Sequence, residues 1–562
     1  MSDARSSALR FITRLLPRRD DYAGLSRSWR GDVLAGATVG VVALPLALAF
    51  GITSGLGAAA GLVTAIVAGL VAGVFGGSNV QVSGPTGAMT VVLVPVVARY
   101  GPDAVLIVSI VAGLLVIAGA LLRLGRYLAF VPWPVVEGFT IGIAVIIFLQ
   151  QVPAALGVAK PDGENTALVA AKALRDAARH GHVASLGVVA LVTVVMTMLP
   201  RLHRSLPASL LAVVTATAVA EAAHLDVGRI GTLPRSLPLP SIPSVSVTQV
   251  SELFSAALAV AILAALESLL SAKVADGMAD TARHDPDREL LGQGLANIVS
   301  PLFGGMPATG AIARTAVNVR SGARTRVAAI THSLVLVLVV LFAGGLVSRI
   351  PLAALAGVLM VTAVRMVEVH NVRSVLRATR SDAVVLVLTT LATVAFDLIM
   401  AVEIGIASAA ILALRHVART AQVTSDSSDL LDPNRVGSLL DEGILTYRLD
   451  GALFFGAAQR FLTELTAVSD AKVVVLRLPA LQVLDATGAQ ALGEIVAELE
   501  HRGITVLLKG PRPEHLRILS ATGVLARLAH QNHLFVDLDA ALTHARLHVA
   551  RSRDAGQVPT PA

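Results

Sequence analysis

Two short stretches of this chain, VSGPTGAM (residues 82–89) and GMPATGAI (residues 305–312), resemble each other within an otherwise strongly apolar sequence. In each, a proline shortly precedes a Thr-Gly pair, Thr86-Gly87 in the first and Thr309-Gly310 in the second. Because proline and glycine disfavour helix interiors, each stretch predicts a break between helices. Two similar breaks far apart in the chain indicate an internal repeat.

The composition is typical of a membrane protein with many spanning helices. Of the 562 residues, 55% are hydrophobic and 15% are charged, and the mean hydropathy is +0.74, whereas a soluble chain is roughly 25% charged. A spanning helix needs about 20 apolar residues. Long and short apolar stretches together predict about fourteen segments, at residues 31–53, 55–76, 85–99, 103–123, 131–157, 183–199, 207–224, 254–274, 288–302, 310–321, 325–345, 351–366, 382–397 and 400–418.

The arginine-rich segment of residues 1–30 predicts the orientation in the plasma membrane. Positively charged segments stay in the cytoplasm, and an even number of crossings then returns the chain to the cytoplasm after residue 420. The loop 158–182 departs from this pattern, because it is predicted to be external and is nevertheless rich in Lys and Arg. Since the net charge of +7 follows from topology, no nucleic-acid partner is predicted.

The positions of the two breaks predict an inverted repeat. The first break precedes the third segment and the second precedes the tenth, 223 residues later (309 − 86), so each holds the same place in a half of seven. Halves with an odd number of crossings are inserted in opposite orientations, as in many secondary transporters. The repeats are predicted at about residues 31–224 and 254–418. Each break predicts a half-helix, and the two opposed half-helix N-termini are predicted to face one another at the membrane midplane and to form an anion site.

The composition and the periodic pattern of the sequence change after residue 420. A polar segment, predicted as a linker over residues 421–439, is followed by apolar β-branched runs that alternate with helical patterns. This alternation predicts a small cytoplasmic α/β domain over residues 440–549. The membrane domain is thus predicted at 31–420, and the polar tail 550–562 is predicted to be disordered.

Four longer stretches carry a resemblance to a known family. They are DVLAGATVGVVALPLALAFG (32–51), GGSNVQVSGPTGAMTVVL (76–93), LESLLSAKVADGM (266–278) and LLGQGLANIVSPLFGGMPATGAIARTAVNVRSGA (290–323). In this order they resemble the sulfate permease (SulP) family of anion transporters, and the end of the chain resembles the STAS domain that this family carries. The resemblance implies a seven-plus-seven inverted repeat with a mobile core domain and a gate domain. It also implies a homodimer in which STAS contributes to assembly or regulation, and sulfate, bicarbonate or C4-dicarboxylates as substrates.

The predicted substrate site joins the two breaks with the first span. Arg314 lies four residues beyond Gly310, too early to be a cytoplasmic anchor, and is expected to add positive potential to the anion site. An ordinary snorkelling arginine is the alternative. Where many family sulfate carriers have glutamine after the proline of the first span, this chain has Leu46, which favours the bicarbonate or dicarboxylate branch. The predicted substrate-binding residues are Pro45, which is expected to interrupt the span, Leu46, Gly84, Pro85, Thr86, Gly87, Ala308, Thr309, Gly310, Ala311, Ala313 and Arg314.

Glu267 is the predicted coupling residue, with Ser268 and Ser271 beside it. It is the only charged residue in residues 254–272, and a carboxylate within the membrane is costly unless it is functional or paired. A glutamate here could carry a proton together with an anion, and pairing with Arg314 in the empty site is also expected. A purely structural ion pair is the alternative, and sodium-coupled relatives place a cation site at this level.

The soluble domain contains candidate functional residues with weaker support from the sequence. The motif LDATG (484–488) resembles the phosphorylation motif of STAS-type regulators, with Thr487 as the possible regulatory phospho-acceptor. Helix capping by Asp485 and Thr487 is the favoured alternative. His530 and His533 are predicted to be surface residues, and no metal site is predicted. The chain has no cysteine, which excludes disulfides and thiolate metal ligands.

These patterns predict a transporter rather than an enzyme, with no cofactor except a coupling ion, H⁺ or alternatively Na⁺. A proton-coupled anion symporter is the leading hypothesis. A sodium-coupled symporter, an uncoupled anion exchanger or channel, and a nucleobase permease of the same inverted-repeat type are the alternatives. The STAS-like domain and Arg314 argue against a nucleobase permease.

Overall fold

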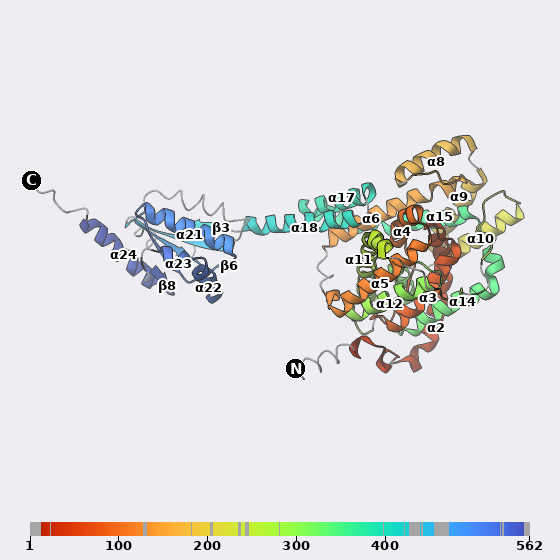
Figure 1. The fold of residues 1–562 in the computed structure, drawn as a ribbon, viewed down its shortest axis with the longest axis horizontal. Coiled ribbons are helices and arrows are strands. Elements are labelled where there is room, and N and C mark those ends of the chain that lie inside the picture. Colours follow the sequence, from red (N-terminus) through yellow and green to blue (C-terminus); the bar gives the residue numbers. More distant parts are fainter. Residues whose placement is uncertain are drawn as a thin grey trace, which may run out of the picture. The chain divides into compact units, whose positions relative to one another are not determined.

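The computed structural model describes residues 13–22, 24–126, 132–163, 165–180, 183–202, 206–233, 236, 238–241, 247–279, 281–396, 398–420, 422–425, 439, 442–453, 471–528, 530 and 533–555. The chain divides into two compact units, Met1–Ile406 and Ala407–Ala562 (Figure 1).

Helices fill the first unit. Its first half contains the short helix η1 (Arg19–Tyr22), α2 (Leu25–Thr53), α3 (Ala58–Phe75), α4 (Gly87–Tyr100), α5 (Asp103–Leu121), η2 (Leu124–Arg126), α6 (Trp133–Gln150), α7 (Val152–Leu156), α8 (Thr166–His180), α9 (Val183–Leu202) and α10 (Ala208–Ala222). The second half contains α11 (Val247–Met278), α12 (Pro286–Leu302), α13 (Ile312–Arg320), α14 (Val327–Val347), α15 (Leu352–Met366), α16 (Val369–Ala378), α17 (Arg380–Ala395) and α18 (Leu398–Thr420), which includes the boundary between the units.

Each of the fourteen predicted segments coincides with one of these helices. Among the described residues, 8 helices are long and apolar enough to cross a membrane by length and composition, and α4 and α10 are shorter apolar helices. α6 and α7 together occupy the predicted segment 131–157, and α8 and α16 are additional helices that the segment count did not include. The chain is therefore a polytopic α-helical membrane protein, as predicted.

Several contacts between a helix of the first half and a helix of the second half have an equivalent contact in which the two halves exchange roles. α5 packs against α11 and α12, and its counterpart in the second half, α14, packs against α2 and α3, the counterparts of α11 and α12. In the same way, α6 packs against α17 while α15 packs against α9. A pseudo-two-fold relation between the halves produces this exchange. The packing is consistent with the predicted seven-plus-seven inverted repeat.

Small residues allow the helices of the first half to approach closely. A Cβ on Gly61 of α3 would overlap the carbonyl of Ala47 in α2, so only glycine fits there. Such small-residue contacts are common between helices in membranes. α2 runs on through Pro45, the residue predicted to interrupt this span with a kink. Proline has no N–H to donate, so one carbonyl of the preceding turn loses its usual partner while the helix goes on.

The N-terminal segment is held against the first unit by ion pairs. Arg288 of α12 donates to both carboxylate oxygens of Asp21, at 2.7 and 2.6 Å, and Arg14 donates to Asp285 at 2.8 Å. Arg326, which is 1% exposed, lies 3.8 Å from Asp21. Part of the segment predicted only as a basic cytoplasmic extension is therefore bound to α12 through acidic residues.

A mixed sheet with helices on both faces forms the second unit. The strands are β3 (Gln422–Ser425), β4 (Ile444–Leu453), β5 (Val473–Arg477), β6 (Leu481–Leu484), β7 (Thr505–Lys509) and β8 (Leu534–Phe535), in the order β3-β4-β5-β7-β8 with β6 also paired to β4. Only the β3–β4 pair is antiparallel. The helices are α21 (Ala486–His501), α22 (Pro513–Ala521), α23 (Val524–Arg527) and α24 (Leu538–Ala555).

Alternating side chains of the central strands build one core on each face of this sheet. Val474 and Leu476 pack in the cluster that contains residues of α21, whereas Val473 and Val475 pack in the cluster that contains residues of α24. Two boundaries differ from those predicted. β3 lies inside the predicted linker 421–439, because it pairs with β4. α24 continues to Ala555, six residues into the predicted tail, while residues 556–562 lie outside the described chain.

Candidate functional site

The two breaks that resemble each other in sequence lie side by side in space. β1 (Ser83–Gly84) and β2 (Thr309–Gly310) form an antiparallel pair, with Ser83 opposite Gly310 and Gly84 opposite Thr309. α4 starts three residues after β1, and α13 starts two residues after β2. The first N–H groups of a helix have no partner inside the helix and carry partial positive charge. The structure therefore brings two positive helix ends together at one place.

The guanidinium of Arg314 lies between these helix ends. The residue is 2% exposed, and its Nη2 donates to the carbonyl of Pro85, between β1 and α4. Its Nη1 is buried and has no hydrogen-bond partner among the described residues. A Cβ on Gly84 would overlap this Nη1, so the glycine leaves the guanidinium its space. A buried cation with a free donor is suited to an anionic ligand.

Glu267 of α11 contacts the N-terminus of α4. Its Oε2 accepts a hydrogen bond of 3.0 Å from the hydroxyl of Thr86, the N-cap residue of α4. The expected pairing of Glu267 with Arg314 is not formed, since no ion pair within 4.0 Å joins these two described residues. The physical reason is that each has a nearer neutral partner: the hydroxyl of Thr86 for Glu267 and the carbonyl of Pro85 for Arg314.

Hydroxyl groups connect α11 to the second break. The hydroxyl oxygens of Ser268 and Thr309 are 2.9 Å apart, and the N–H of Gly310 donates to Ser268 at 3.1 Å. One turn further, Ser271 donates to the hydroxyl of Thr315 at 3.1 Å. Glu267 and the two serines predicted with it therefore contact residues of both breaks.

The remaining predicted residues lie around this arrangement. The carbonyl of Ala308 accepts from the side-chain amide nitrogen of Asn297 at 2.8 Å, and its N–H donates to the side-chain amide oxygen of Asn297 at 2.9 Å. Ala311 is the N-cap of α13 and Ala313 is exposed. A Cβ on Gly87 would overlap the side chain of Ile147, which fixes how closely α4 approaches α6. Pro45 and Leu46 lie in α2, Pro45 buried and Leu46 packed against the main apolar core.

Two buried polar side chains at the site were not predicted. His332 of α14 is fully buried, and neither of its ring nitrogens has a hydrogen-bond partner among the described residues. The amide of Gln81 is also without a partner in the described chain, and a Cβ on Gly310 would overlap it. The available signal was a polar side chain close to a predicted site element: His332 is the only titratable residue of α14, whereas Gln81 lies among Ser78, Asn79 and Ser83 just before the first break. It was missed because a single histidine or glutamine is compatible with many core positions.

In the second unit, the structure shows the helix cap predicted for Asp485 of LDATG. Asp485 is the N-cap of α21, and its carboxylate accepts from the N–H of Gly488 at 2.7 Å, as predicted. Thr487 is exposed in the first turn. The prediction that His530 and His533 are surface residues holds only for His530. His533 is fully buried, because it precedes edge strand β8 on the side covered by α24.

An inverted repeat of helices, with two helix ends and a buried arginine at its centre, followed in the sequence by an α/β domain, defines a membrane transporter of the anion-carrier class. Residues 29–389 match the sulfate permease family, and residues 440–541 match the STAS domain. The chain belongs to the sulfate permease family. Members of this family are transporters and not enzymes, and their substrates are small anions.

Relatives match over nearly the full length. YvdB of Bacillus subtilis, whose name proposes sulfate transport, is 34% identical over 91% of this chain and 96% of its own. The bicarbonate transporter BicA of Synechocystis is 33% identical over 93% of this chain and 95% of its own.

Solved structures show the same fold. The transmembrane domain of a cyanobacterial bicarbonate transporter BicA aligns with a TM-score of 0.63 at 32% identity, covering 67% of this chain and 98% of that chain. The overall structure of SLC26A9 aligns with a TM-score of 0.81 over 98% of this chain and 96% of that chain, and at 16% identity it shows the fold alone.

Proposed function

We propose that this protein is a secondary active transporter that carries a small anion, namely sulfate, bicarbonate or a C4-dicarboxylate, across the plasma membrane by alternating access with proton symport. The observation that supports this most directly is the free donor of the Arg314 guanidinium between the N-termini of α4 and α13. Positive helix ends and a guanidinium select for negative charge.

Glu267 is the residue through which the anion and the proton are coupled in this proposal. Its carboxylate accepts from Thr86 at the N-terminus of α4, so an anion bound at the helix ends competes with it for the same positive potential. Two negative charges close together favour protonation of the carboxylate. By reciprocity, protonation of Glu267 then favours anion binding.

Sodium symport is the second candidate, and it fits bicarbonate best. A proton delivered next to bicarbonate would convert it to carbonic acid, which yields membrane-permeant CO₂, whereas sulfate and most dicarboxylates stay charged. Relatives named as bicarbonate transporters are therefore easier to reconcile with a sodium ion. The carboxylate of Glu267 and the hydroxyl oxygens of Ser268 and Thr309 are hard oxygen ligands of the type that sodium prefers.

The remaining parts of the proposal concern orientation and assembly. The N-terminus and the STAS domain are placed in the cytoplasm on the strength of the arginine-rich N-terminal segment. A homodimer with a STAS contribution, and regulation by phosphorylation of Thr487, are proposed from the family resemblance. The exposure of Thr487 at the start of α21 supports the latter, since a phosphate is stabilised at a helix N-terminus.

Uptake into proteoliposomes tests the coupling. Wild type, Glu267→Gln and Glu252→Gln are compared with sulfate, bicarbonate, fumarate, succinate, nitrate and chloride, with and without an inward proton gradient and with and without sodium. Glu252 is the matched control, because it is an exposed carboxylate on the same helix.

Glu267→Gln should still bind the anion and lose accumulation driven by the proton gradient, while Glu252→Gln behaves as wild type. Equal concentrative uptake by wild type and Glu267→Gln would refute proton coupling through this residue. A strict sodium requirement would favour the second candidate, and non-saturable flux that follows only the anion gradient would favour a channel.

A further inference from the structure

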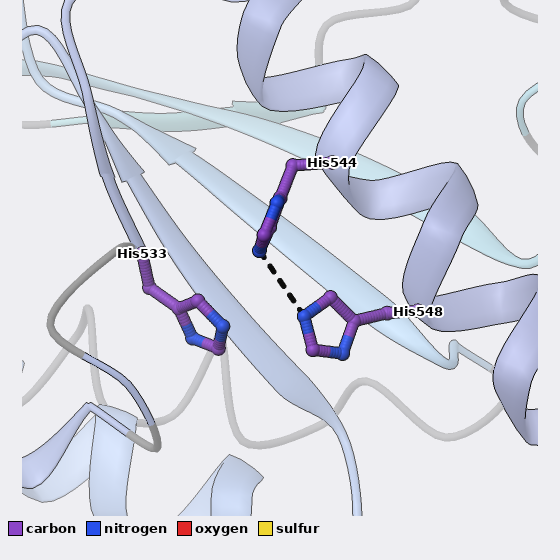
Figure 2. Close-up of side chains that lie close together, drawn as sticks. All are labelled: His533, His544 and His548. Atoms are coloured by element: carbon purple, nitrogen blue, oxygen red, sulfur yellow. Dashed lines mark hydrogen bonds between the residues drawn. The ribbon is translucent and has the colours of Figure 1, made fainter.

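Three histidine side chains meet between the edge of the sheet and α24 in the second unit. His533 directly precedes β8, and His544 and His548 lie four residues apart on α24. One ring nitrogen of each lies within 4.8 Å of those of the other two. Figure 2 shows the three imidazoles close together, with a dashed line for the hydrogen bond between His544 and His548. The Nε2 atoms of these two residues are 3.2 Å apart.

His533 is the most constrained member of this histidine cluster. It is fully buried, and neither ring nitrogen makes a hydrogen bond of ordinary geometry within the described chain. A buried imidazole whose ring nitrogens have no hydrogen-bond partner is suited to a metal ion, since the ring nitrogen of a neutral imidazole is a common metal ligand.

The spacing of the cluster is close to that of a zinc site. Zinc prefers tetrahedral coordination with Zn–N bonds of about 2.0–2.1 Å, which places ligand nitrogens about 3.3 Å apart. The 3.2 Å between His544 and His548 is already near this value. Two histidines at positions i and i+4 of a helix present their rings to one metal ion. Small side-chain rotations would bring the nitrogen of His533, within 4.8 Å, to the same distance.

We propose that His533, His544 and His548 bind one Zn²⁺ ion in the STAS domain. Three imidazoles leave a fourth position for water. His530 lies at the rim of the site: it is exposed, and its ring centroid is 5.4 Å from that of His533. His544 and His548 are half-buried, which provides an entry route from the surface.

A bound metal ion would connect the sheet edge to the last helix of the domain. His533 is next to β8, whereas His544 and His548 belong to α24, which packs on β5 and β7. Because the metal binds the folded arrangement and not the unfolded chain, it should stabilise this part of the fold.

Metal analysis of the full-length protein tests the proposal. The protein is purified in detergent with an affinity tag that contains no histidine, stripped with EDTA, and titrated with Zn²⁺ and with Co²⁺. Bound metal is measured by mass spectrometry, and Co²⁺ is followed by its visible absorption. Wild type is compared with His544→Gln, with the double variant His544→Gln/His548→Gln, and with His515→Gln. His515 is the matched control, because it is a buried histidine of the same domain outside the cluster.

Wild type and His515→Gln should bind about one metal ion per chain, with the strong visible bands of tetrahedral Co²⁺. They should also unfold at a higher temperature with Zn²⁺ than without it. The single variant should bind at least tenfold more weakly, and the double variant should show neither the bands nor the shift. Absence of saturable binding by wild type, or undiminished binding by the double variant, would overturn the proposal.

Discussion

Replacement of Arg314 is the sharpest test of the anion site. The guanidinium donates to the Pro85 carbonyl through Nη2 and has its buried Nη1 free. Arg314→Lys keeps the positive charge and replaces the planar fork by a single ammonium group. Arg314→Ala removes charge and fork together and also leaves the buried Pro85 carbonyl without this donor.

The expected loss of anion affinity follows from the number of N–H donors that the substitution removes. If the free donor binds the anion, the variant loses one charge-assisted hydrogen bond, which contributes about 1.5–3 kcal/mol. This corresponds to an anion affinity about 10- to 150-fold weaker. We expect Arg314→Lys to fall in this range, because a single ammonium group cannot occupy both positions of the fork. Arg314→Ala should fall beyond it, with no measurable uptake, because the charge itself is lost.

The assay is substrate uptake and equilibrium binding in proteoliposomes, with size-exclusion profiles to show that each variant is folded and to compare its oligomeric state with wild type. Arg320→Ala is the matched control, because this arginine lies in the last turn of the same helix and is exposed. The control should transport as wild type does. A wild-type KM in Arg314→Ala would show that Arg314 does not belong to the anion site. A wild-type KM in Arg314→Lys alone would show that only the charge of Arg314 matters.

Three further predictions concern the second unit. Deletion of residues 440–562 should leave anion binding intact and lower transport or expression, because every proposed site residue lies in the first unit; loss of binding in a well-folded truncation would contradict this. Asp485→Ala should destabilise the STAS domain by about 1 kcal/mol through loss of the cap on Gly488, measured by hydrogen exchange of α21 and β5; unchanged exchange would argue against the cap. Burial lowers the pKa of His515 below its usual value of 6.5, opposed by Glu514 and reinforced by Arg512, so the folded domain binds fewer protons than the unfolded chain. Its stability should therefore fall as the pH drops below about 6.5, and His515→Gln should reduce this dependence in urea unfolding with EDTA; an identical pH profile for the variant would refute the assignment.

Much of the first unit could be predicted from sequence because its signals are local. Apolar runs long enough for a membrane marked the helices, and Pro-Gly breaks marked the half-helices. The pairing of β1 with β2 could not be predicted in this way, because Ser83 and Gly310 are more than 200 residues apart and a two-residue strand has no periodicity. The offset of the breaks predicted that the two helix ends face one another in one site, and the fold adds the strand pairing that joins them.

The errors share a physical cause, which is that side-chain partners depend on packing. The expected Glu267–Arg314 pair treated both residues as lone charges in hydrocarbon, whereas a hydroxyl and a carbonyl at the helix ends provide nearer partners. His533 looked like a surface residue in a polar loop, and its burial depends on α24 covering the sheet edge. His544 and His548 had no signal of their own, since histidines four residues apart are common on exposed helix faces.

The two helix ends at the proposed site are related by the repeat but differ chemically. At the start of α4, the hydroxyl of Thr86 accepts from the N–H of Met89 at 3.5 Å and donates to Glu267 at 3.0 Å. At the start of α13, the N-cap is Ala311, whose side chain has no oxygen that could accept a hydrogen bond from the first N–H groups of this helix. Arg314 is also on α13. An anion should therefore bind closer to α13. The acid that responds to it, Glu267, is hydrogen-bonded to the N-cap of α4. If so, loss of the Thr86 hydroxyl should disturb coupling more than affinity, whereas loss of Arg314 should disturb affinity first.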